Sequence, residues 1–427
     1  TLREAIAWSY ELLAPDEQRL FRRLAPFVGA FTADGAAAVA GQPLENTWIG
    51  IESLLAQSLL HRPVDVGEAR FDMLQTLREY AFEQLEQCGE LEATLHRHAR
   101  YYLLLAQREN ESDDAGRKTL QSLLPELEEI RAALRRCVQM EERELGLRLA
   151  SATWRVWQSA GRYAEGRSWL SRLLKEPGPS AAVRADALTA LAGLAYWQAD
   201  YPPAWAAYEE ALEHYRSAGD RANEAEVLNA LSMTATWQGD PAAGADLAVE
   251  ARASFEALGA KAKVGETLMA QGFALWQEHR YIDARPLWED ALAISRELGD
   301  DALAVTQLAG LAGLAFHTGA VADATRIALD ALDQACDLEH AGLCVWLLDF
   351  VAAFAVAERP HQALRVAGAA DALRTASGGG KRVEELHIEP ARTAARRHLD
   401  RVDLERAWAE GRRLDLEAAI DEARSLR

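Results

Sequence analysis

Three similar tetrapeptides decide how this chain folds, and they are Trp197-Gln198-Ala199-Asp200, Trp237-Gln238-Gly239-Asp240 and Trp276-Gln277-Glu278-His279. Aromatic residues recur through this region at spacings of 40, 40, 39 and 40 residues, namely Trp157, Trp197, Trp237, Trp276 and Phe316. A second series keeps the same period, namely Gly219, Gly259 and Gly299. Such a period is typical of stacked helical hairpins, which usually bind other molecules rather than catalyse reactions.

Within each repeat, small and aromatic residues follow the tetratricopeptide pattern. The fourth repeat is the clearest example, with Leu268, Gly272 and Leu275 on its first helix and Ala284, Trp288 and Ala291 on its second. The usual unit has about 34 residues, so the helices or loops here are expected to be longer. We predict a right-handed superhelix of about six such repeats over residues 145–376.

The composition favours a folded, mainly all-α protein, with 49% hydrophobic and 26% charged residues among 427. The net charge of −20 argues against broad contact with nucleic-acid phosphates. There is no long apolar run and no signal peptide, so we expect a cytoplasmic protein without a membrane partner. The cysteines form no Cys-x-x-Cys pair, which predicts reduced thiols and no metal site; they are Cys88, Cys137, Cys336 and Cys344.

Residues 1–90 do not share the period. Helices are predicted from Thr1, from Pro15 and over residues 44–60, with a short Ala-rich helix ending at Gly41. Residues 60–62 and 69–73 then flank a turn and predict a small β-hairpin. Helices followed by a hairpin indicate a winged helix-turn-helix domain. We therefore divide the chain into a winged helix (1–90), a helical linker (91–144), the superhelix (145–376) and a C-terminal helical cap (377–427).

Several segments resemble the winged-helix and sensor region of bacterial STAND-type signalling NTPases, the multidomain regulators of the AfsR and LuxR-like classes. The segments that carry the resemblance are residues 1–10, 17–24, 27–32, 70–81, 96–102 and 407–412. The best match reads Arg70-Phe71-Asp72-Met73-Leu74-Gln75-Thr76-Leu77-Arg78-Glu79-Tyr80-Ala81. The chain opens on Thr1 rather than Met, so we expect it to be a piece of a longer protein.

The resemblance implies an autoinhibitory arrangement. In this family a P-loop nucleotide-binding domain precedes the winged helix, holds ADP or ATP, and is released when the repeats bind an inducer. This chain lacks Gly-x-x-x-x-Gly-Lys-Ser/Thr, so we expect no enzyme activity and no cofactor within it. The expected contact with the nucleotide-binding domain consists of Met73, Leu74, Gln75 and Arg78. Relatives carry Met-His-Asp where this chain reads Met73-Leu74-Gln75, which argues against phosphate sensing there.

The first helix of each repeat should line a groove that binds a protein, a peptide or a small inducer. Aligning the repeats predicts the lining Trp157, Tyr196, Trp197, Asn229, Met233, Trp237, Phe273, Trp276, Phe316 and His317, with Thr153 and Asp349 beside it. Acidic residues are predicted near its rim and no Lys or Arg, so an apolar or cationic ligand is expected; they are Asp186, Glu226 and Glu266. The alternative is that the aromatic residues only pack against neighbouring repeats.

Other functions remain as alternatives. The chain could be a plain interaction scaffold, or the winged helix could bind DNA. The second is disfavoured because the candidate recognition helix carries Glu45 and Glu52 but no Lys or Arg. The segment 377–382 is interpreted as a linker rather than a phosphate loop. His96 and His98 are predicted to be surface residues on different faces of a helix, and therefore not a metal pair.

Overall fold

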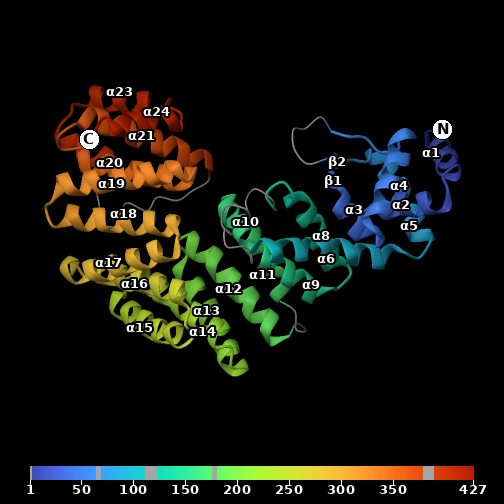
Figure 1. Cartoon of the computed structure of the whole chain (residues 1–427), viewed down its shortest axis with the longest axis horizontal. Coiled ribbons are helices and arrows are strands. Elements are labelled where there is room, and N and C mark those ends of the chain that lie inside the picture. Colours follow the sequence, from blue (N-terminus) through green and yellow to red (C-terminus); the bar gives the residue numbers. More distant parts are fainter. Residues whose placement is uncertain (1, 64–68, 111–122, 176–179, 378–388) are drawn as a thin grey trace. The chain divides into compact units, whose positions relative to one another are not determined.

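The computed structural model describes residues 2–63, 69–110, 123–175, 180–377 and 389–427 (Figure 1). Clustering of contacts divides the chain into two compact units. Unit 1 contains residues 1–159 and 164–191, and unit 2 contains residues 160–163 and 192–427. The predicted mainly helical fold class is confirmed, since the described residues form helices and a single two-stranded sheet.

Unit 1 begins with the helices of the winged-helix domain, and the sequence sets their ends. They are α1 (Leu2–Glu11), α2 (Pro15–Arg23), α3 (Ala33–Ala40), α4 (Leu44–Ala56) and α5 (Gln75–Gln87). Pro15 suits the first position of α2, where no backbone N–H is needed, and the Glu17 carboxylate accepts from the Ala14 N–H at 2.8 Å. Thr32 caps α3 by accepting from the Gly35 N–H, and Gly41 ends it in the left-handed conformation at φ 67°.

The sheet of this domain differs from the predicted hairpin. Strand β1 (Phe31–Thr32) pairs antiparallel with β2 (Arg70–Phe71), and Phe31 lies opposite Phe71. The predicted partner, His61, forms only an isolated bridge to Asp72. Residues 64–68, which hold most of the predicted turn, lie outside the described part. The hairpin prediction missed β1 because two residues ahead of a helix carry no alternating pattern of their own.

The second half of unit 1 consists of helices that pack against the winged helix and against each other. They are α6 (Leu91–Asn110), α8 (Leu127–Gln139), α9 (Arg143–Ala152), α10 (Trp154–Ser159), α11 (Tyr163–Leu174) and the first part of α12 (Ala181–Trp197). Helix α6 contacts α3 on one side and α8 and α9 on the other. The winged helix is therefore continuous with the helices that follow it within this unit.

Unit 2 is a stack of antiparallel helices in which each helix packs against the next. After α12 they are α13 (Tyr201–Ala218), α14 (Arg221–Gln238), α15 (Pro241–Ala257), α16 (Lys261–Gln277), α17 (Tyr281–Leu298), α18 (Asp301–His317), α19 (Val321–Asp337), α20 (Ala341–Ala355) and α21 (Pro360–Ser377). Aspartates cap three of them by accepting a backbone N–H, namely Asp220, Asp240 and Asp300. Asp220 and Asp300 start the first helices of two repeats, whereas Asp240 starts a second helix, and Ala260 takes the corresponding place before α16.

The helix starts reveal a slip in the aromatic series. Helices α14 and α16 begin 40 residues apart, at Arg221 and Lys261. Trp237 lies sixteen residues after the start of α14, whereas Trp276 lies only fifteen after the start of α16. One residue turns a side chain by about 100° around a helix. Trp276 therefore cannot occupy the place of Trp237, although the spacing of 39 suggested that it would.

The last helices pack on the end of the stack, and they are α22 (Ala391–Ala394), the 3₁₀ turn η2 (Ala395–Arg397), α23 (Arg401–Gly411) and α24 (Leu416–Arg424). Helix α23 packs closely against α21 at Gly411. A Cβ added at Gly411 would stand only 2.1 Å from the Arg365 carbonyl oxygen. Helix α24 contacts α19, α20 and α21. The end of the helix stack is thus covered by residues 391–424.

Candidate functional site

Unit 2 presents a partly exposed stripe of large side chains on two successive first helices. We call it the α14/α16 stripe: Asn229, Met233 and Trp237 from α14, with Met269 and Phe273 from α16. Spacing of four residues places each set on one helix face. The two sets meet where the rings of Trp237 and Phe273 lie with their centroids 5.6 Å apart. The Asn229 Oδ1 atom is buried and has no hydrogen-bond partner among the described residues.

The charge beside this stripe differs from the prediction. Lys263, in the first turn of α16, forms ion pairs with Glu226 at 2.9 Å and with Glu266 at 3.2 Å. Burial alone would lower the pKa of Lys263, but the two carboxylates outweigh it and raise that pKa. The sequence alignment predicted no Lys or Arg on the groove positions; Lys263 is not one of those positions, but it pairs with two of the acidic residues predicted near the rim. Lys263 therefore offsets one of the two negative charges that Glu226 and Glu266 carry.

Another acidic residue that was predicted beside the groove also forms an ion pair within the protein. Asp349 of α20 forms an ion pair with Arg374 of α21. Its charge is thus balanced from the next helix rather than offered to a cationic ligand. Together with Lys263, this pair weakens the predicted preference for a cation.

Two predicted groove residues belong to the core. Trp157 in unit 1 and Trp276 in unit 2 are both fully buried. Trp276 is turned away from the accessible face by the slip described above, and it packs against Trp288 with ring centroids 5.2 Å apart. Neither side chain can contact a ligand in this structure, so the packing alternative holds for these two.

The remaining predicted residues are partly exposed and lie among other rings. Tyr196 and Trp197 meet edge to face at 6.0 Å. His317 stacks on Tyr281 with centroids 4.7 Å apart and planes within 6°. Phe316 stacks on Phe354 at 4.8 Å. Ligand contact by these four side chains stays a prediction. The other four predicted groove residues, Asn229, Met233, Trp237 and Phe273, lie together in the α14/α16 stripe.

Of the four winged-helix residues that were predicted to contact a nucleotide-binding domain, two hold the domain together and two are exposed. Met73 is 2% exposed, and Arg78 donates to the Val28 and Met73 carbonyl oxygens at 2.8 and 2.9 Å. Both side chains therefore hold the domain together, which corrects their assignment to an interface. Leu74 is 58% exposed and Gln75 is exposed. Leu74 also lines a surface depression with Leu55, Ser58, Leu59, Leu60, His61 and Arg62.

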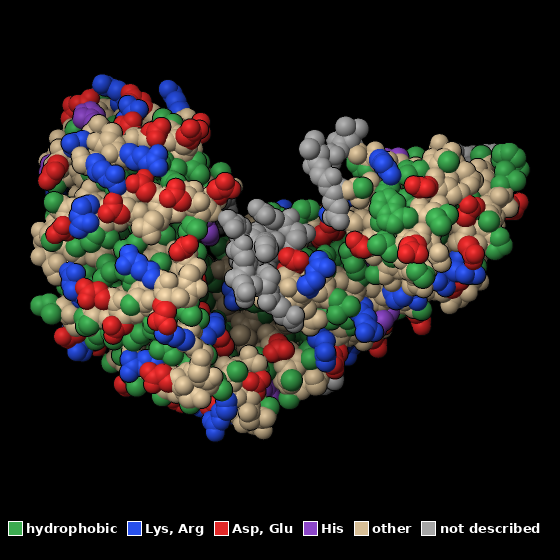
Figure 2. Space-filling view, viewed as in Figure 1, with side chains coloured by type: hydrophobic (Ala, Val, Ile, Leu, Met, Phe, Trp, Pro, Cys, Tyr) green, Lys and Arg blue, Asp and Glu red, His purple; other side chains and the backbone are tan. Residues whose placement is uncertain are grey.

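The exposed face of α4 suits protein contact better than DNA. Ile49 is 69% exposed, and Glu45 and Glu52 are exposed on the same helix. On the face shown in Figure 2, basic and acidic side chains are interspersed on this unit and form no broad basic patch. Helix α4 carries no Lys or Arg, the residue types that neutralise phosphates and most often read guanine.

The seam between the winged helix and α8 holds a buried polar network that the sequence did not reveal. His98 of α6 is fully buried, and its Nε2 lies 3.1 Å from Glu129 Oε2. The other Glu129 oxygen accepts the Val28 and Gly29 N–H groups at 2.8 and 2.7 Å. The prediction that His98 is a surface residue was wrong, because α8 packs over it from a distant part of the chain.

A second carboxylate extends this network. Glu126 pairs with Arg70 of β2 and accepts from the Tyr102 hydroxyl at 3.2 Å. Burial raises the pKa of Glu126 despite the opposing effect of Arg70, and burial lowers the pKa of His98 despite Glu129. The sequence did offer one signal for this buried network. Glu126 and Glu129 lie three residues apart, at the start of a helix that is otherwise rich in buried aliphatic residues.

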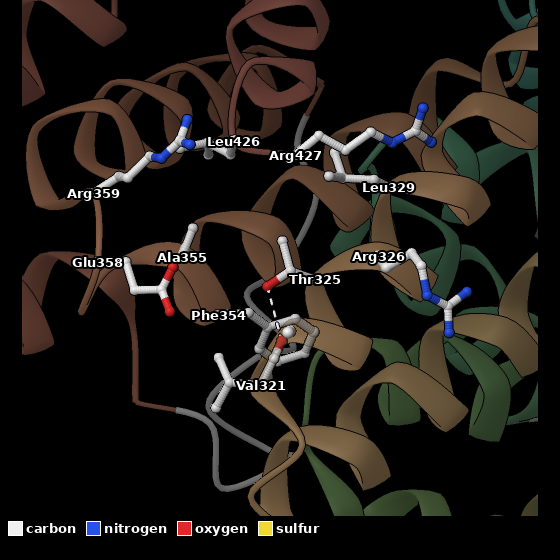
Figure 3. Close-up of a pocket in the computed structure, with 11 residues that line it drawn as sticks. Val321, Thr325, Arg326, Leu329, Phe354, Ala355, Glu358, Arg359, Leu426 and Arg427 are labelled. Carbon is white, nitrogen blue, oxygen red and sulfur yellow. Dashed lines mark hydrogen bonds between the residues drawn. The ribbon is translucent and has the colours of Figure 1, made fainter.

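Figure 3 shows a small cavity of about 160 Å³ between α19, the end of α20 and Leu426. Thr325 lies in it and donates to the Val321 carbonyl oxygen at 3.1 Å. Arg326 pairs with Asp323 at 3.2 Å, and Arg427 pairs with Asp333 at 2.9 Å. Since these two guanidinium groups are engaged, we assign no ligand to this cavity.

Comparisons with known proteins agree with the N-terminal architecture. Residues 13–86 match the family model described as Winged helix-turn-helix domain. A protein named as an HTH-type transcriptional regulator in Mycobacterium tuberculosis is 35% identical over 236 residues, which are 52% of this chain and 26% of that protein. An uncharacterized protein of the same species is 32% identical over 105 residues, 24% of this chain and 27% of that protein. The chain thus spans about a quarter of the length of each relative.

Two solved structures have a similar arrangement of helices. One is a STAND protein with a tetratricopeptide repeat sensor from Pyrococcus horikoshii, with 16% identity, a TM-score of 0.43, and coverage of 94% of this chain and 66% of that chain. The other is aspartyl phosphate phosphatase F from Bacillus subtilis, with 11% identity, a TM-score of 0.49, and coverage of 95% and 96%. We base no functional argument on either likeness.

The described residues contain neither a membrane-spanning helix nor a cluster of metal-binding side chains. No helix there is long and apolar enough to cross a membrane. Nor does that part of the chain bring three His, Cys, Asp or Glu side chains together around a metal position.

Proposed function

We propose that this chain is the sensor region of a larger transcriptional regulator, and that unit 2 binds a peptide or small molecule on the α14/α16 stripe. The observation that carries the proposal is the stripe itself. It places two methionines, Trp237 and Phe273 beside a buried, unpartnered Asn229 oxygen.

The chemistry of the stripe favours an apolar ligand. Methionine side chains adapt to irregular apolar shapes, and aromatic rings supply large contact area. Because Lys263 pairs with both Glu226 and Glu266 and offsets one of their two charges, a cationic ligand is less favoured than the sequence suggested.

The winged helix would act as a docking domain for another part of the same polypeptide. Supporting this are the exposed Leu74, Gln75 and Ile49 and the lack of basic side chains on α4. In the STAND-like arrangement, that part would be a nucleotide-binding domain holding ADP or ATP outside this chain. Ligand binding would relieve the contact only if the ligand prefers the released arrangement, since equal affinity for two states shifts neither.

The test uses an apolar fluorescent dye, ANS, as a probe of the stripe. Trp237→Ala and Phe273→Ala should each reduce ANS binding several-fold while the circular dichroism spectrum is kept. The matched control is Trp205→Ala, a partly exposed tryptophan on the second helix α13. Equal binding by all three variants would show that the dye, and therefore the apolar surface it detects, lies elsewhere.

A DNA-binding regulator is the second candidate, favoured by the names of the mycobacterial relatives. It predicts that this chain retains random duplex DNA in a gel-shift assay at low salt, with steep loss as salt rises. A docking domain predicts no retention under the same conditions. An interaction scaffold, the third candidate, predicts one stoichiometric protein partner in a pull-down and no bound small molecule.

A further inference from the structure

Two cysteines from consecutive helices of unit 2 face each other. Cys336 lies in the last turn of α19 and Cys344 in the first turn of α20, and their Sγ atoms are 3.8 Å apart. Both are free thiols in this structure. A disulfide needs about 2.05 Å between sulfur atoms, so a side-chain adjustment of about 2 Å would suffice to close the bond.

The surroundings distinguish the two thiols. Cys344 is 2% exposed, whereas Cys336 is partly exposed and can be reached from solvent. Burial, and next the neighbouring Cys336 thiol, raise the pKa of Cys344 to about 12. The Arg424 guanidinium is near enough to interact electrostatically with both sulfurs, and it is held by Asp333 at 2.9 Å.

We propose that Cys336 and Cys344 form a redox-active dithiol, which a hydroperoxide converts into an intrachain disulfide linking α19 to α20. The Cys336 thiolate attacks the peroxide, the O–O bond breaks, and Cys336 becomes a sulfenic acid. Cys344 then attacks that sulfur, the S–O bond breaks and the S–S bond forms. Hydrogen peroxide leaves as two waters, which carry away the two thiol hydrogens, and both cysteines are oxidised.

The other two cysteines provide internal controls. Cys88 is exposed in unit 1 and Cys137 is buried there. Cys88 should react with alkylating reagents faster than either thiol of the pair, yet it has no thiol beside it with which to form an intrachain bond. A general sensitivity of cysteines to oxidant can therefore be separated from pairing at Cys336 and Cys344.

The test treats the Cys88→Ser chain with hydrogen peroxide under native conditions. We expect a mass loss of about 2 Da that dithiothreitol reverses. Glu339 lies between the two cysteines, so cleavage after glutamate should leave two peptides joined by the disulfide. Cys336→Ser should show no mass loss. Cys344→Ala should stop at a Cys336 sulfenic acid, which dimedone traps.

The proposal is overturned if the native chain oxidises at Cys336 without losing two hydrogens, or if the linked peptides form only in denaturant. Circular dichroism of each variant before oxidation establishes that the folded chain is being compared. The result is independent of ligand binding on the α14/α16 stripe, since that surface contains neither cysteine.

Discussion

Trp276 occupies the space that a side chain on Gly313 would need. A Cβ at Gly313 would stand 2.2 Å from Trp276 Cη2 and 3.0 Å from Cζ3, which is closer than real contacts allow. Trp288 fills the equivalent space at Gly272 and Gly310, with approaches of 2.8 and 3.1 Å. Tryptophan and glycine are therefore paired between helices α16, α17 and α18, and this pairing sets how closely these repeats stack.

Gly313→Ala should destabilise unit 2 by about 1–3 kcal/mol, because the ring of Trp276 must move from a packed core. Trp276→Ala should cost about 3–5 kcal/mol by leaving a cavity. Urea unfolding followed by circular dichroism measures both. Gly342→Ala is the matched control, since its nearest neighbour would be an ordinary contact at 3.4 Å. A neutral Gly313→Ala would mean that the tryptophan is not confined.

Unit 1 should lose stability as the pH falls below about 6.5. His98 is fully buried and its folded pKa is lowered, chiefly by burial, from the ordinary value of 6.5. Between the folded pKa and 6.5, the unfolded state binds more protons, so acid favours unfolding. His98→Gln should flatten the dependence of unfolding free energy on pH between 7 and 5, measured by urea titration. An unchanged slope would contradict this assignment.

Glu129→Ala should be strongly destabilising, by about 3–5 kcal/mol, because three donors, one of them fully buried, lose their acceptor. These are the Val28 and Gly29 N–H groups and His98 Nε2. Glu129→Gln should cost less, since one amide oxygen can still accept. Hydrogen exchange at Val28 and Gly29 reports the loss directly; protection that survives Glu129→Ala would show that the carboxylate is dispensable.

Lys263→Gln should destabilise unit 2 by about 1 kcal/mol, since it removes the cation that pairs with both Glu226 and Glu266. Adding Glu226→Gln should restore most of the loss. A double-mutant cycle measures this coupling. Additive effects of the two substitutions would mean that the ion pairs are not coupled in solution.

Much of the fold was predictable, because period and capping are local signals. Pro15, Gly41 and the recurring aspartates mark helix ends directly in the sequence. The site was only partly predictable. Asn229, Met233 and Trp237 lie four residues apart, so their common face could be inferred. Trp276 could not be placed, because the helix start, not the spacing of tryptophans, sets its direction. His98 was misjudged because α8 covers it from about thirty residues away.

The most direct test of the sensor proposal is native mass spectrometry of the chain purified from a bacterial lysate. The account predicts a bound small molecule or peptide on the wild-type chain and on Trp205→Ala. It also predicts that Trp237→Ala and Phe273→Ala lose this ligand while staying folded. A ligand that remains bound to Trp237→Ala and Phe273→Ala would contradict the account, and so would a wild-type chain that binds none even when an apolar peptide library is supplied.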